Sequence, residues 1–503
     1  MNINEFPKEV RSRLVPAPGG DLVYNCLGCS AVHGIDSLLY TCPECGSVLM
    51  IEDRDFDRHL EIPGPLWRKI FDFRKSLNIP ALKGVYLFHE FVGPDMPLEN
   101  IVWLGEGHTP AVEASPELQK KAGVRFFFKN EGQNPSASFK DRGMASAFSR
   151  INHLIKNGVL SDVLAICAST GDTSASAALY AAYLKPHVTS AVLLPRGKVT
   201  SQQLSQPLGN GAVVFEIPGV FDDCMKVVEE LSETCEVALL NSKNAWRILG
   251  QESYSYEIAQ DFSYDTGRLA VVVPIGNAGN ITAVMNGFLK FHRAGIIETL
   301  PKIIGVQSSH ANPVFRYYSE EDPSRRRFSP VSVKPSVAQA AMIGNPVSMP
   351  RVIRLAEEYE KIAGQKKFFV VEVSEQQIMD WQLTANRYGN IACTHGGESL
   401  AGLVNAKGQG IVTDEDVAVL DSTAHMLKFA GFQQMYFENN FPQHYGITPH
   451  SSLVNVPQAV QPPGFCEQPE TDSRDEEEFG TFVKETAKII AGRLGLKKKK
   501  VIP

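Results

Sequence analysis

The chain has 503 residues, of which 43% are hydrophobic and 21% are charged, and this ordinary globular composition excludes a disordered or fibrous protein. The formal net charge of −7 offers no basic surface to a polyanion, so we expect no nucleic-acid partner. No apolar run approaches the roughly 20 residues that a membrane-spanning helix needs, and the stretch from Met1 to Val10 lacks the apolar core of a signal peptide. We therefore expect a cytoplasmic enzyme without a membrane partner.

Two C-x-x-C pairs stand near the N-terminus, with twelve residues between them. Disulfides are rare in a reducing cytoplasm, whereas four thiolates on two adjoining knuckles can surround Zn²⁺ tetrahedrally. Gly28, Pro43 and Gly46 stand where tight knuckles would bend. A cluster of reduced or redox-active cysteines is the alternative. We predict a zinc-ribbon-like module whose metal is structural, because four cysteines leave no coordination position for a substrate. The predicted ligands are Cys26, Cys29, Cys42 and Cys45.

Beyond residue 100, short apolar runs of β type alternate with longer helical stretches. This alternation is typical of parallel strands joined by crossover helices. We predict an α/β fold with two doubly wound domains and a ligand cleft between them, at the carboxyl ends of the strands. The predicted strands are 163–168, 189–194, 212–217, 237–241 and 269–275, and the predicted helices include 174–184 and one that begins near Asn280.

The domain boundaries follow from these runs. The cysteine module takes 1–60, a large domain takes 61–145 and 265–460, and a smaller α/β domain takes 146–264. The tail, 461–503, contains two prolines, an acidic run, a predicted helix over 477–494 and four lysines at 497–500. A solvated tail is the ordinary interpretation of such charge runs, and contact with an anionic partner is the alternative.

The segment 134–143 reads N-P-S-A-S-F-K-D-R-G and contains a candidate nucleophile. Lys140 follows an aromatic residue at a loop-to-helix entrance that we expect Ser138 to cap. A lysine in that place can be partly desolvated and can then act as an amine nucleophile. A single lysine is ordinarily a surface charge, so this pattern alone leaves both roles open.

Hydroxyls gather in the segment 168–174, which reads A-S-T-G-D-T-S and joins a predicted strand to a predicted helix. Free amides and hydroxyls at a helix N-terminus bind a carboxylate or a phosphate. Ordinary helix capping explains the same residues equally well.

The segment 241–251, N-S-K-N-A-W-R-I-L-G-Q, places an arginine one turn after a serine and an asparagine. A guanidinium can hold a phosphate through two hydrogen bonds, which favours a phosphorylated substrate. The alternative for Arg247 is a structural ion pair.

The segment 276–280, G-N-A-G-N, follows an apolar strand and precedes a helix. Small residues there let backbone N–H groups close around a phosphate, and the helix dipole favours its charge. A plain tight turn would use the same residues.

Together these strings resemble the threonine synthases, a family in the tryptophan-synthase-β-like group of pyridoxal-phosphate enzymes with fold type II. The lysine segment resembles the family's S-F-K-D-R-G, 169–173 resembles S-T-G-N/D-T, the arginine segment resembles N-S-x-N-x-x-R-x-x-G-Q, and 104–110 resembles L-G-E-G-x-T-P. Two weaker matches are 421–428, with Ala424 and Met426 in place of glycines, and 393–399, which resembles a segment beside the cofactor ring. The resemblance covers roughly residues 100 to 435.

The resemblance implies pyridoxal 5′-phosphate as the cofactor, held by Lys140, which would also be the catalytic base. Asp172 would lie beside the cofactor ring, although a carboxylate cannot donate a hydrogen bond to its phenolic oxygen unless protonated. Thr423 would face the pyridine nitrogen. The cofactor's phosphate would lie in the turn formed by Gly276, Asn277, Ala278, Gly279 and Asn280. Substrate contacts would come from Ser169 and Thr173, and contacts to a substrate phosphate from Asn241, Ser242 and Arg247.

The implied reaction is the conversion of O-phospho-L-homoserine and water to L-threonine and phosphate by γ-elimination and β-addition, in a homodimeric lyase. A cysteate synthase acting on phosphoserine would use the same scaffold. A threonine dehydratase would too, but it needs no site for a substrate phosphate. A catalytically silent zinc-ribbon scaffold protein is a further alternative. Such a protein would be expected to have another residue in place of the lysine, whereas this chain has Lys140.

Overall fold

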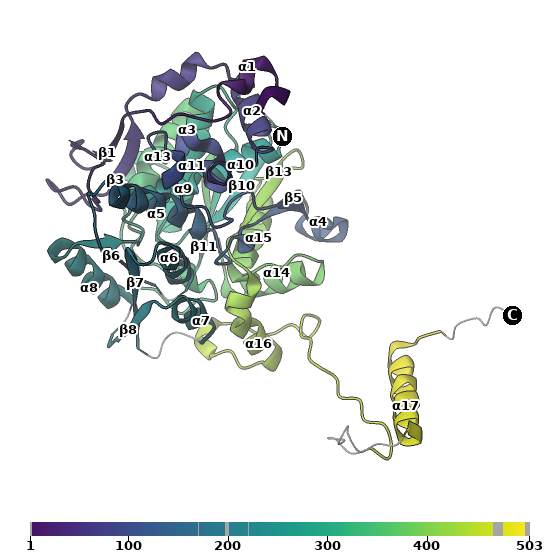
Figure 1. Ribbon diagram of the computed structural model, residues 1–503. Helices are drawn as coiled ribbons and strands as arrows, with labels where there is room; N and C mark the ends of the chain where they lie inside the picture. Colours follow the sequence, from purple (N-terminus) through teal and green to yellow (C-terminus); the bar gives the residue numbers. More distant parts are fainter. Residues whose placement is uncertain (1–2, 170, 197–200, 220, 466–475, 498–503) are drawn as a thin grey trace. The chain divides into compact units, whose positions relative to one another are not determined.

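The computed structural model describes residues 3–169, 171–196, 201–219, 221–465 and 476–497, and the chain divides into two units after Leu453. Three sheets lie in the first unit, two of them built of β/α repeats (Figure 1). Within the described residues, no helix is long and apolar enough to span a bilayer.

The larger sheet has six strands in the order β12-β11-β10-β13-β5-β4. All neighbours are parallel except β4, which pairs antiparallel with β5 at one edge. Every residue of β10 is buried, as expected for a strand in the middle of a parallel sheet that is covered on both faces. The strands are β4 Ala111–Glu113, β5 Arg125–Asn130, β10 Leu269–Pro274, β11 Lys302–Ser308, β12 Phe368–Val373 and β13 Val417–Ser422.

The smaller sheet has four parallel strands in the order β8-β7-β6-β9. The four strands predicted for this region are confirmed, and β9 ends at Leu239, so that Asn241 lies just beyond it. Helices α6 (Asp172–Tyr183), α7 (Ser201–Gly209) and α8 (Phe221–Thr234) accompany this sheet (Figure 1). The strands are β6 Val163–Ala168, β7 Val188–Pro195, β8 Val213–Ile217 and β9 Val237–Leu239.

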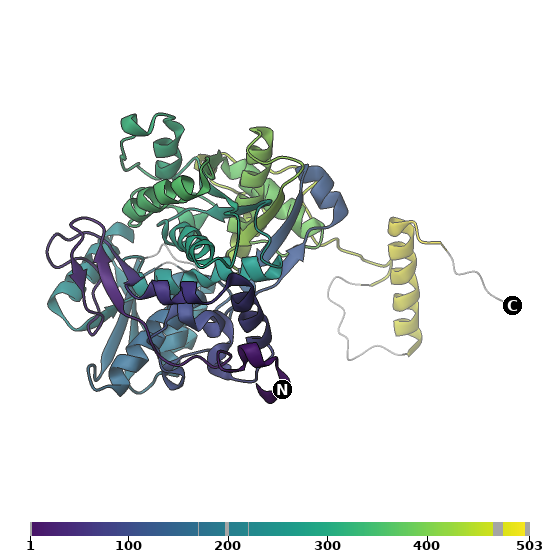
Figure 2. The same ribbon diagram turned by 90° about the horizontal axis from the view of Figure 1, so that it is seen from above.

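The N-terminal ribbon is a small antiparallel sheet in the order β2-β1-β3. Its strands are β1 Leu22–Cys26, β2 Val32–His33 and β3 Leu49–Asp53. Its apolar side chains, such as Tyr24 and Leu49, belong to the main hydrophobic core. The ribbon therefore packs against the body of the first unit, as the two views show (Figures 1 and 2).

Two helices that carry site residues cross at very close range. These are α5 (Lys140–Lys156) and α9 (Ala245–Gln251). A Cβ on Gly250 would lie 2.3 Å from the carbonyl oxygen of Arg142, and a Cβ on Gly143 would lie 2.9 Å from that of Arg247. Glycine at both positions is what lets the two helices approach, and their contact brings the Lys140 end of α5 toward Arg247.

The remaining helices surround these elements. They are α1 Lys8–Arg11, α2 Gly64–Arg74, α3 His89–Val92, α4 Pro116–Ala122, α10 Ser253–Asp261, α11 Gly279–Arg293, α12 Pro313–Ser319, α13 Met349–Ala363, α14 Glu375–Arg387, α15 Thr394–Gly408 and α16 Ala430–Glu438. The predicted fold class, two parallel α/β sheets preceded by a ribbon module, is confirmed. The domain boundaries stay a prediction.

The second unit contains helix α17, Glu476–Leu494, which confirms the helix predicted over 477–494. Within this unit the rings of Phe465 and Phe482 lie 5.2 Å apart, and Arg493 donates a hydrogen bond of 2.9 Å to the carbonyl oxygen of Ala459. Most of the predicted acidic and lysine runs lie outside the described residues.

Candidate active site

Lys140 is the first residue of α5, and its Nζ lies 4.2 Å from the centre of the Phe139 ring. The predicted cap by Ser138 is wrong: Phe139 is the N-cap residue, and no side chain caps the helix. The reason is a long-range contact. Ser138 forms a β-bridge with Ala424, and the Phe139 N–H donates to the carbonyl oxygen of Thr423, so Ser138 is held against a distant segment and does not cap the helix. The buried Ser138 hydroxyl has no partner among the described residues.

The charges around Lys140 favour a neutral amine. Burial lowers the pKa of Lys140 to about 7, and the nearby positive charge of Arg247 adds to the effect. Asp172 and Asp421 act in the opposite direction, and Lys428 lowers the pKa further. An amine with a pKa near neutrality is a competent nucleophile and base at physiological pH.

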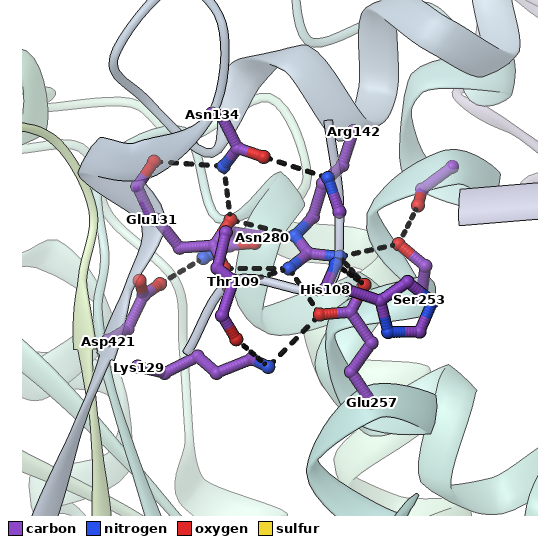
Figure 3. A network of polar contacts seen from close by, with 12 residues as sticks. His108, Thr109, Lys129, Glu131, Asn134, Arg142, Ser253, Glu257, Asn280 and Asp421 are labelled. Atoms are coloured by element: carbon purple, nitrogen blue, oxygen red, sulfur yellow. Dashed lines mark hydrogen bonds and ion pairs between the residues drawn. The ribbon is translucent and has the colours of Figure 1, made fainter. Parts of the chain in front are cut away.

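A buried polar network fixes the first turn of α5 (Figure 3). Arg142 donates two hydrogen bonds of 2.7 Å to Glu131 and two more, of 2.6 and 2.7 Å, to Glu257. Lys129 lies 3.0 Å from Glu257, and the Thr109 hydroxyl donates to Glu131 over 2.6 Å. Removing any one of the charged partners would leave an uncompensated buried charge, so the network locks the position of the helix that carries Lys140.

One hydrogen bond joins the glycine-asparagine turn to the residue Asp421 on β13. Asn280 Nδ2 donates to Asp421 Oδ2 over 2.7 Å (Figure 3). Burial raises the pKa of the Asp421 carboxyl well above its usual range, and the charge of Glu131 adds to that shift. The Asn280 side chain is therefore turned toward the end of β13.

The rest of that turn has the geometry of an anion site. Ala278 has a φ of 62° and forms the N-cap of α11, which begins at Gly279 and is fifteen residues long. The first amides of a helix have no partner within the helix, and its dipole adds positive potential. A Cβ on Gly276 would lie 2.9 Å from Cα of Ala341, so glycine is needed for the close approach of these two backbone segments.

The hydroxyl segment lies at the start of α6. The Ser169 hydroxyl accepts hydrogen bonds from the N–H groups of Gly171 and Ser174, at 3.2 and 3.1 Å, so its oxygen stabilises the turn. Thr173 is half-buried. Asp172 is buried, and its carboxylate lies 2.9 Å from the Lys428 ammonium. Thr170, also part of this motif, lies outside the described residues.

Arg247 is a buried cation without an acidic partner among the described residues. Its side chain donates one hydrogen bond, of 2.9 Å, to the carbonyl oxygen of Leu240, and its Nε has no partner among the described residues. Burial lowers the pKa of Arg247 to about 10, and the one group that opposes this shift is the Cys167 thiol. The structural ion pair considered as the alternative role is not found within the described residues. A buried guanidinium of this kind can hold an anion.

The two other predicted phosphate ligands have different surroundings. Both groups of the Asn241 amide are bonded to the backbone of Ala168, at 2.7 and 3.0 Å, and so hold the end of β9 against the end of β6. Ser242 is half-buried, and its carbonyl oxygen accepts a hydrogen bond from Arg351. The roles that the resemblance assigns to these and the other site residues stay predictions.

Thr423 lies just beyond β13, with its hydroxyl 3.8 Å from the Cys393 thiol. His395, to which the sequence assigned no role, is buried beside Phe429, and its pKa is lowered to about 4 by burial. Asp172 opposes this shift and Lys140 adds to it, so His395 lies within the electrostatic reach of the site. Lys428 and Asp421 were missed as well, although both stand in the motif string 421–428.

These residues fit the predicted cofactor. The buried atoms left without partners in the described chain include Ser138 Oγ, Arg247 Nε, Asp421 Oδ1 and His395 Nδ1, and they lie on segments that surround or adjoin Lys140. A near-neutral amine, a helix N-terminus and an unpaired guanidinium are the groups that an aldehyde cofactor and two phosphate groups require.

The four predicted metal ligands come together in the ribbon, with their sulfur atoms all within 4.8 Å of one another. Cys26 Sγ lies 3.4 Å from Cys45 Sγ, and Cys29 Sγ lies 3.7 Å from Cys42 Sγ. Zinc–sulfur bonds of about 2.3 Å at tetrahedral angles place the sulfurs roughly 3.8 Å apart, so the cluster fits a zinc ion. A Cβ on Gly28 would lie 2.1 Å from Ser47 Oγ, which explains the predicted glycine at this knuckle.

Comparison with known proteins agrees with this geometry. The family model described as pyridoxal-phosphate dependent enzyme matches residues 102–422. Threonine synthase from Methanocaldococcus jannaschii is 34% identical over 416 residues, which are 81% of this chain and 93% of the relative. Threonine synthase 2, chloroplastic, from Arabidopsis thaliana is 32% identical over 419 residues, 82% of this chain and 77% of the relative.

Among solved structures, the crystal structure of threonine synthase from Escherichia coli superposes with a TM-score of 0.62 at 19% identity. The match covers 87% of this chain and 93% of that one, and it shows a shared fold.

Proposed function

Because the chain belongs to the threonine synthase family of pyridoxal-phosphate-dependent enzymes, we propose that it converts O-phospho-L-homoserine and water to L-threonine and phosphate. The observation that carries the proposal is Arg247, a buried cation without a carboxylate partner in the described chain, whose charge acts on Lys140. A substrate that is both an amino acid and a phosphate ester would match that pair of groups.

Each of these residues would have its own role in the reaction. Pyridoxal phosphate, when bound, would supply the electron sink that makes the substrate's α-proton acidic. Lys140 would hold the cofactor and then remove the α-proton with its neutral amine. Arg247 would bind the phosphate that leaves from the γ-carbon and stabilise its developing charge. A β-proton must also be removed before the phosphate leaves. Water would then add its hydroxyl at the β-carbon, protons would return to the α- and γ-carbons, and Lys140 would be the group that returns the α-proton.

The cofactor would be held at both of its ends. The turn formed by 276–280 would bind its phosphate through main-chain N–H groups, and the hydroxyl of Thr423 would meet the ring nitrogen. Asp172 would stand beside the ring together with Lys428, its ion-pair partner. We further propose that the four ribbon cysteines hold one structural zinc ion. The homodimer and the cytoplasmic location stay predictions.

The test is a product assay on the purified, cofactor-loaded protein. With O-phospho-L-homoserine we expect threonine and phosphate in equal amounts. With O-phospho-L-serine and sulfite we expect no release of phosphate. If the protein turned over phosphoserine and not phosphohomoserine, a cysteate synthase would be favoured. Phosphate without threonine, or neither product, contradicts the proposal.

A further inference from the structure

Arg351, on α13, is a fully buried arginine that makes no ion pair within the described residues, and burial lowers its pKa to about 10. Its guanidinium is nevertheless satisfied. It donates from Nε and Nη2 to the carbonyl oxygen of Leu49 at 3.1 and 2.6 Å, and from Nη1 to the Ser348 hydroxyl at 2.9 Å. Its remaining bonds go to the carbonyl oxygens of Ser242 and Lys243, at 3.0 and 3.2 Å. All five N–H donors of the side chain are thus used.

These five bonds join three separate parts of the molecule. Leu49 is the first residue of ribbon strand β3, and it stands four positions after Cys45. Ser242 and Lys243 belong to the segment that leads into Arg247. Ser348 donates its N–H to the carbonyl oxygen of Asn277, in the glycine-asparagine turn, over 3.1 Å. A cation that bonds to main-chain carbonyls in this way fixes the relative positions of the backbones it touches.

A second contact connects the ribbon to the same segment. Trp246, the neighbour of Arg247 on α9, donates from Nε1 to the hydroxyl of Tyr24 over 2.7 Å, and both side chains are buried. Tyr24 lies on β1, two residues before Cys26. The ribbon is therefore connected to both ends of the segment 242–247: directly from Tyr24 to Trp246, and through Arg351 from Leu49 to Ser242 and Lys243.

We propose that the cysteine ribbon, acting through Arg351 and Tyr24, positions the segment 242–247 and so sets the affinity of the site for the substrate's phosphate. Arg351 and Tyr24 are positioning residues and touch no reacting atom. The inference rests on the proposed role of Arg247 as the phosphate ligand. It assigns to the ribbon a function in substrate binding besides its contribution to folding.

The test measures binding of inorganic phosphate to the cofactor-loaded protein by calorimetry, so that no turnover is needed. Tyr24→Phe removes one hydroxyl and keeps the ring, and we expect it to weaken phosphate binding about two- to tenfold, the loss typical of one buried hydrogen bond. KM for O-phospho-L-homoserine should rise by the same factor, while kcat, cofactor content and zinc content stay near wild type. Arg351→Met should show a larger loss of phosphate affinity.

Tyr40→Phe is the matched control, because the Tyr40 hydroxyl donates to the carbonyl oxygen of Val237, on β9, over 3.3 Å, whereas the Tyr24 hydroxyl bonds to Trp246 on α9. It should bind phosphate as the wild type does. Wild-type phosphate affinity in folded Tyr24→Phe overturns the inference even if Arg351→Met fails to fold, and so does an equal loss in Tyr40→Phe. Arg247→Met separates the two claims: if it binds phosphate as the wild type does, the phosphate site itself is wrong.

Discussion

The Lys428 ammonium lies 2.9 Å from the Asp172 carboxylate, with side-chain exposures of only 12% and 3%, and it also donates to the carbonyl oxygen of Ser136 over 2.9 Å. An anionic Asp172 cannot donate a hydrogen bond to a phenolic oxygen. Lys428 carries three N–H bonds and therefore supplies a hydrogen-bond donor next to the Asp172 carboxylate. The acid and the lysine therefore act as one unit at the edge of the site.

Replacing Lys428 by methionine should shift the titration of Lys140 to higher pH. The charge of Lys428 lowers the pKa of Lys140, whereas the charge of Asp172 raises it, so removing Lys428 leaves Asp172 unopposed. The measurement is the pH dependence of cofactor attachment, followed by visible absorbance in the purified protein. Lys428→Arg keeps the cation and should keep the wild-type profile. An unchanged profile in Lys428→Met would show that the pair has no electrostatic effect on the site.

The rate of cofactor attachment to the wild-type apoprotein should rise with pH and level off above neutrality. The attacking amine must be neutral, and burial lowers the pKa of Lys140 from 10.5 to about 7, so the neutral form prevails above that pH. Stopped-flow absorbance between pH 6 and 9 would give the profile. A rate that keeps rising tenfold per pH unit to pH 9 would mean that Lys140 titrates like an ordinary surface lysine.

Arg247→Met should raise KM for O-phospho-L-homoserine about a hundredfold, equivalent to about 3 kcal/mol, because it removes charge-assisted hydrogen bonds to a phosphate. Steady-state phosphate release gives KM and kcat. Lys243→Met is the matched control: Lys243 is a cation of the same segment, but it pairs with Glu229 at 2.8 Å and should be replaceable with little effect. Equal losses in both variants would mean that only the general positive charge of the segment matters.

Glu106→Gln should stabilise the protein at alkaline pH. Burial raises the pKa of Glu106 to about 8, while its carboxyl accepts hydrogen bonds from Tyr180 at 2.7 Å and from the N–H of Leu104 at 3.0 Å. The folded state keeps this proton and the unfolded state loses it near pH 4.5. The contribution of this group to the free energy of unfolding is therefore fully present below that pH. It falls by about 1.4 kcal/mol per pH unit until pH 8.

Denaturant unfolding of wild type and Glu106→Gln at pH 6, 7 and 8 tests this. The free energy of unfolding of the variant should increase relative to that of the wild type as pH rises. The reason is that glutamine stays neutral and its oxygen can still accept both hydrogen bonds. A constant difference across the three pH values would show that Glu106 is ionised in the folded protein.

The purified protein should contain one zinc ion per chain, and Cys42→Ser should lose it and unfold at a lower temperature. Cys42 is buried in the ribbon, whose strands pack into the main core. Metal analysis by mass spectrometry and thermal unfolding measure both effects. Cys235→Ser removes an exposed cysteine outside the cluster and should keep the metal. A wild-type protein free of zinc after expression in zinc-supplemented medium would favour the reduced-cysteine alternative.

The parallel sheets could be predicted because their signal is local. All residues of β10 are buried, so the strand stands out as an unbroken apolar run between turns. The cysteine cluster was equally predictable, since its ligands are paired along the chain. The Ser138 cap was not, because the bridge to Ala424 depends on a segment far away in the sequence.

In the site too, features with a local sequence signal were predicted and features that depend on distant segments were not. Lys140 and Arg247 were found from motif strings, but their electrostatic coupling depends on the crossing of α5 and α9 at Gly143 and Gly250, which no local pattern encodes. The Asp172–Lys428 pair joins the first residue of α6 to a segment that follows β13, far away in the sequence, and was missed for the same reason.

The most direct test of the account is the release of threonine and phosphate from O-phospho-L-homoserine by wild type and by Lys140→Ala. We expect the wild type to form both products in a one-to-one ratio and Lys140→Ala to form neither above background, with its fold unchanged by circular dichroism. Threonine formation at the wild-type rate by Lys140→Ala would contradict the account.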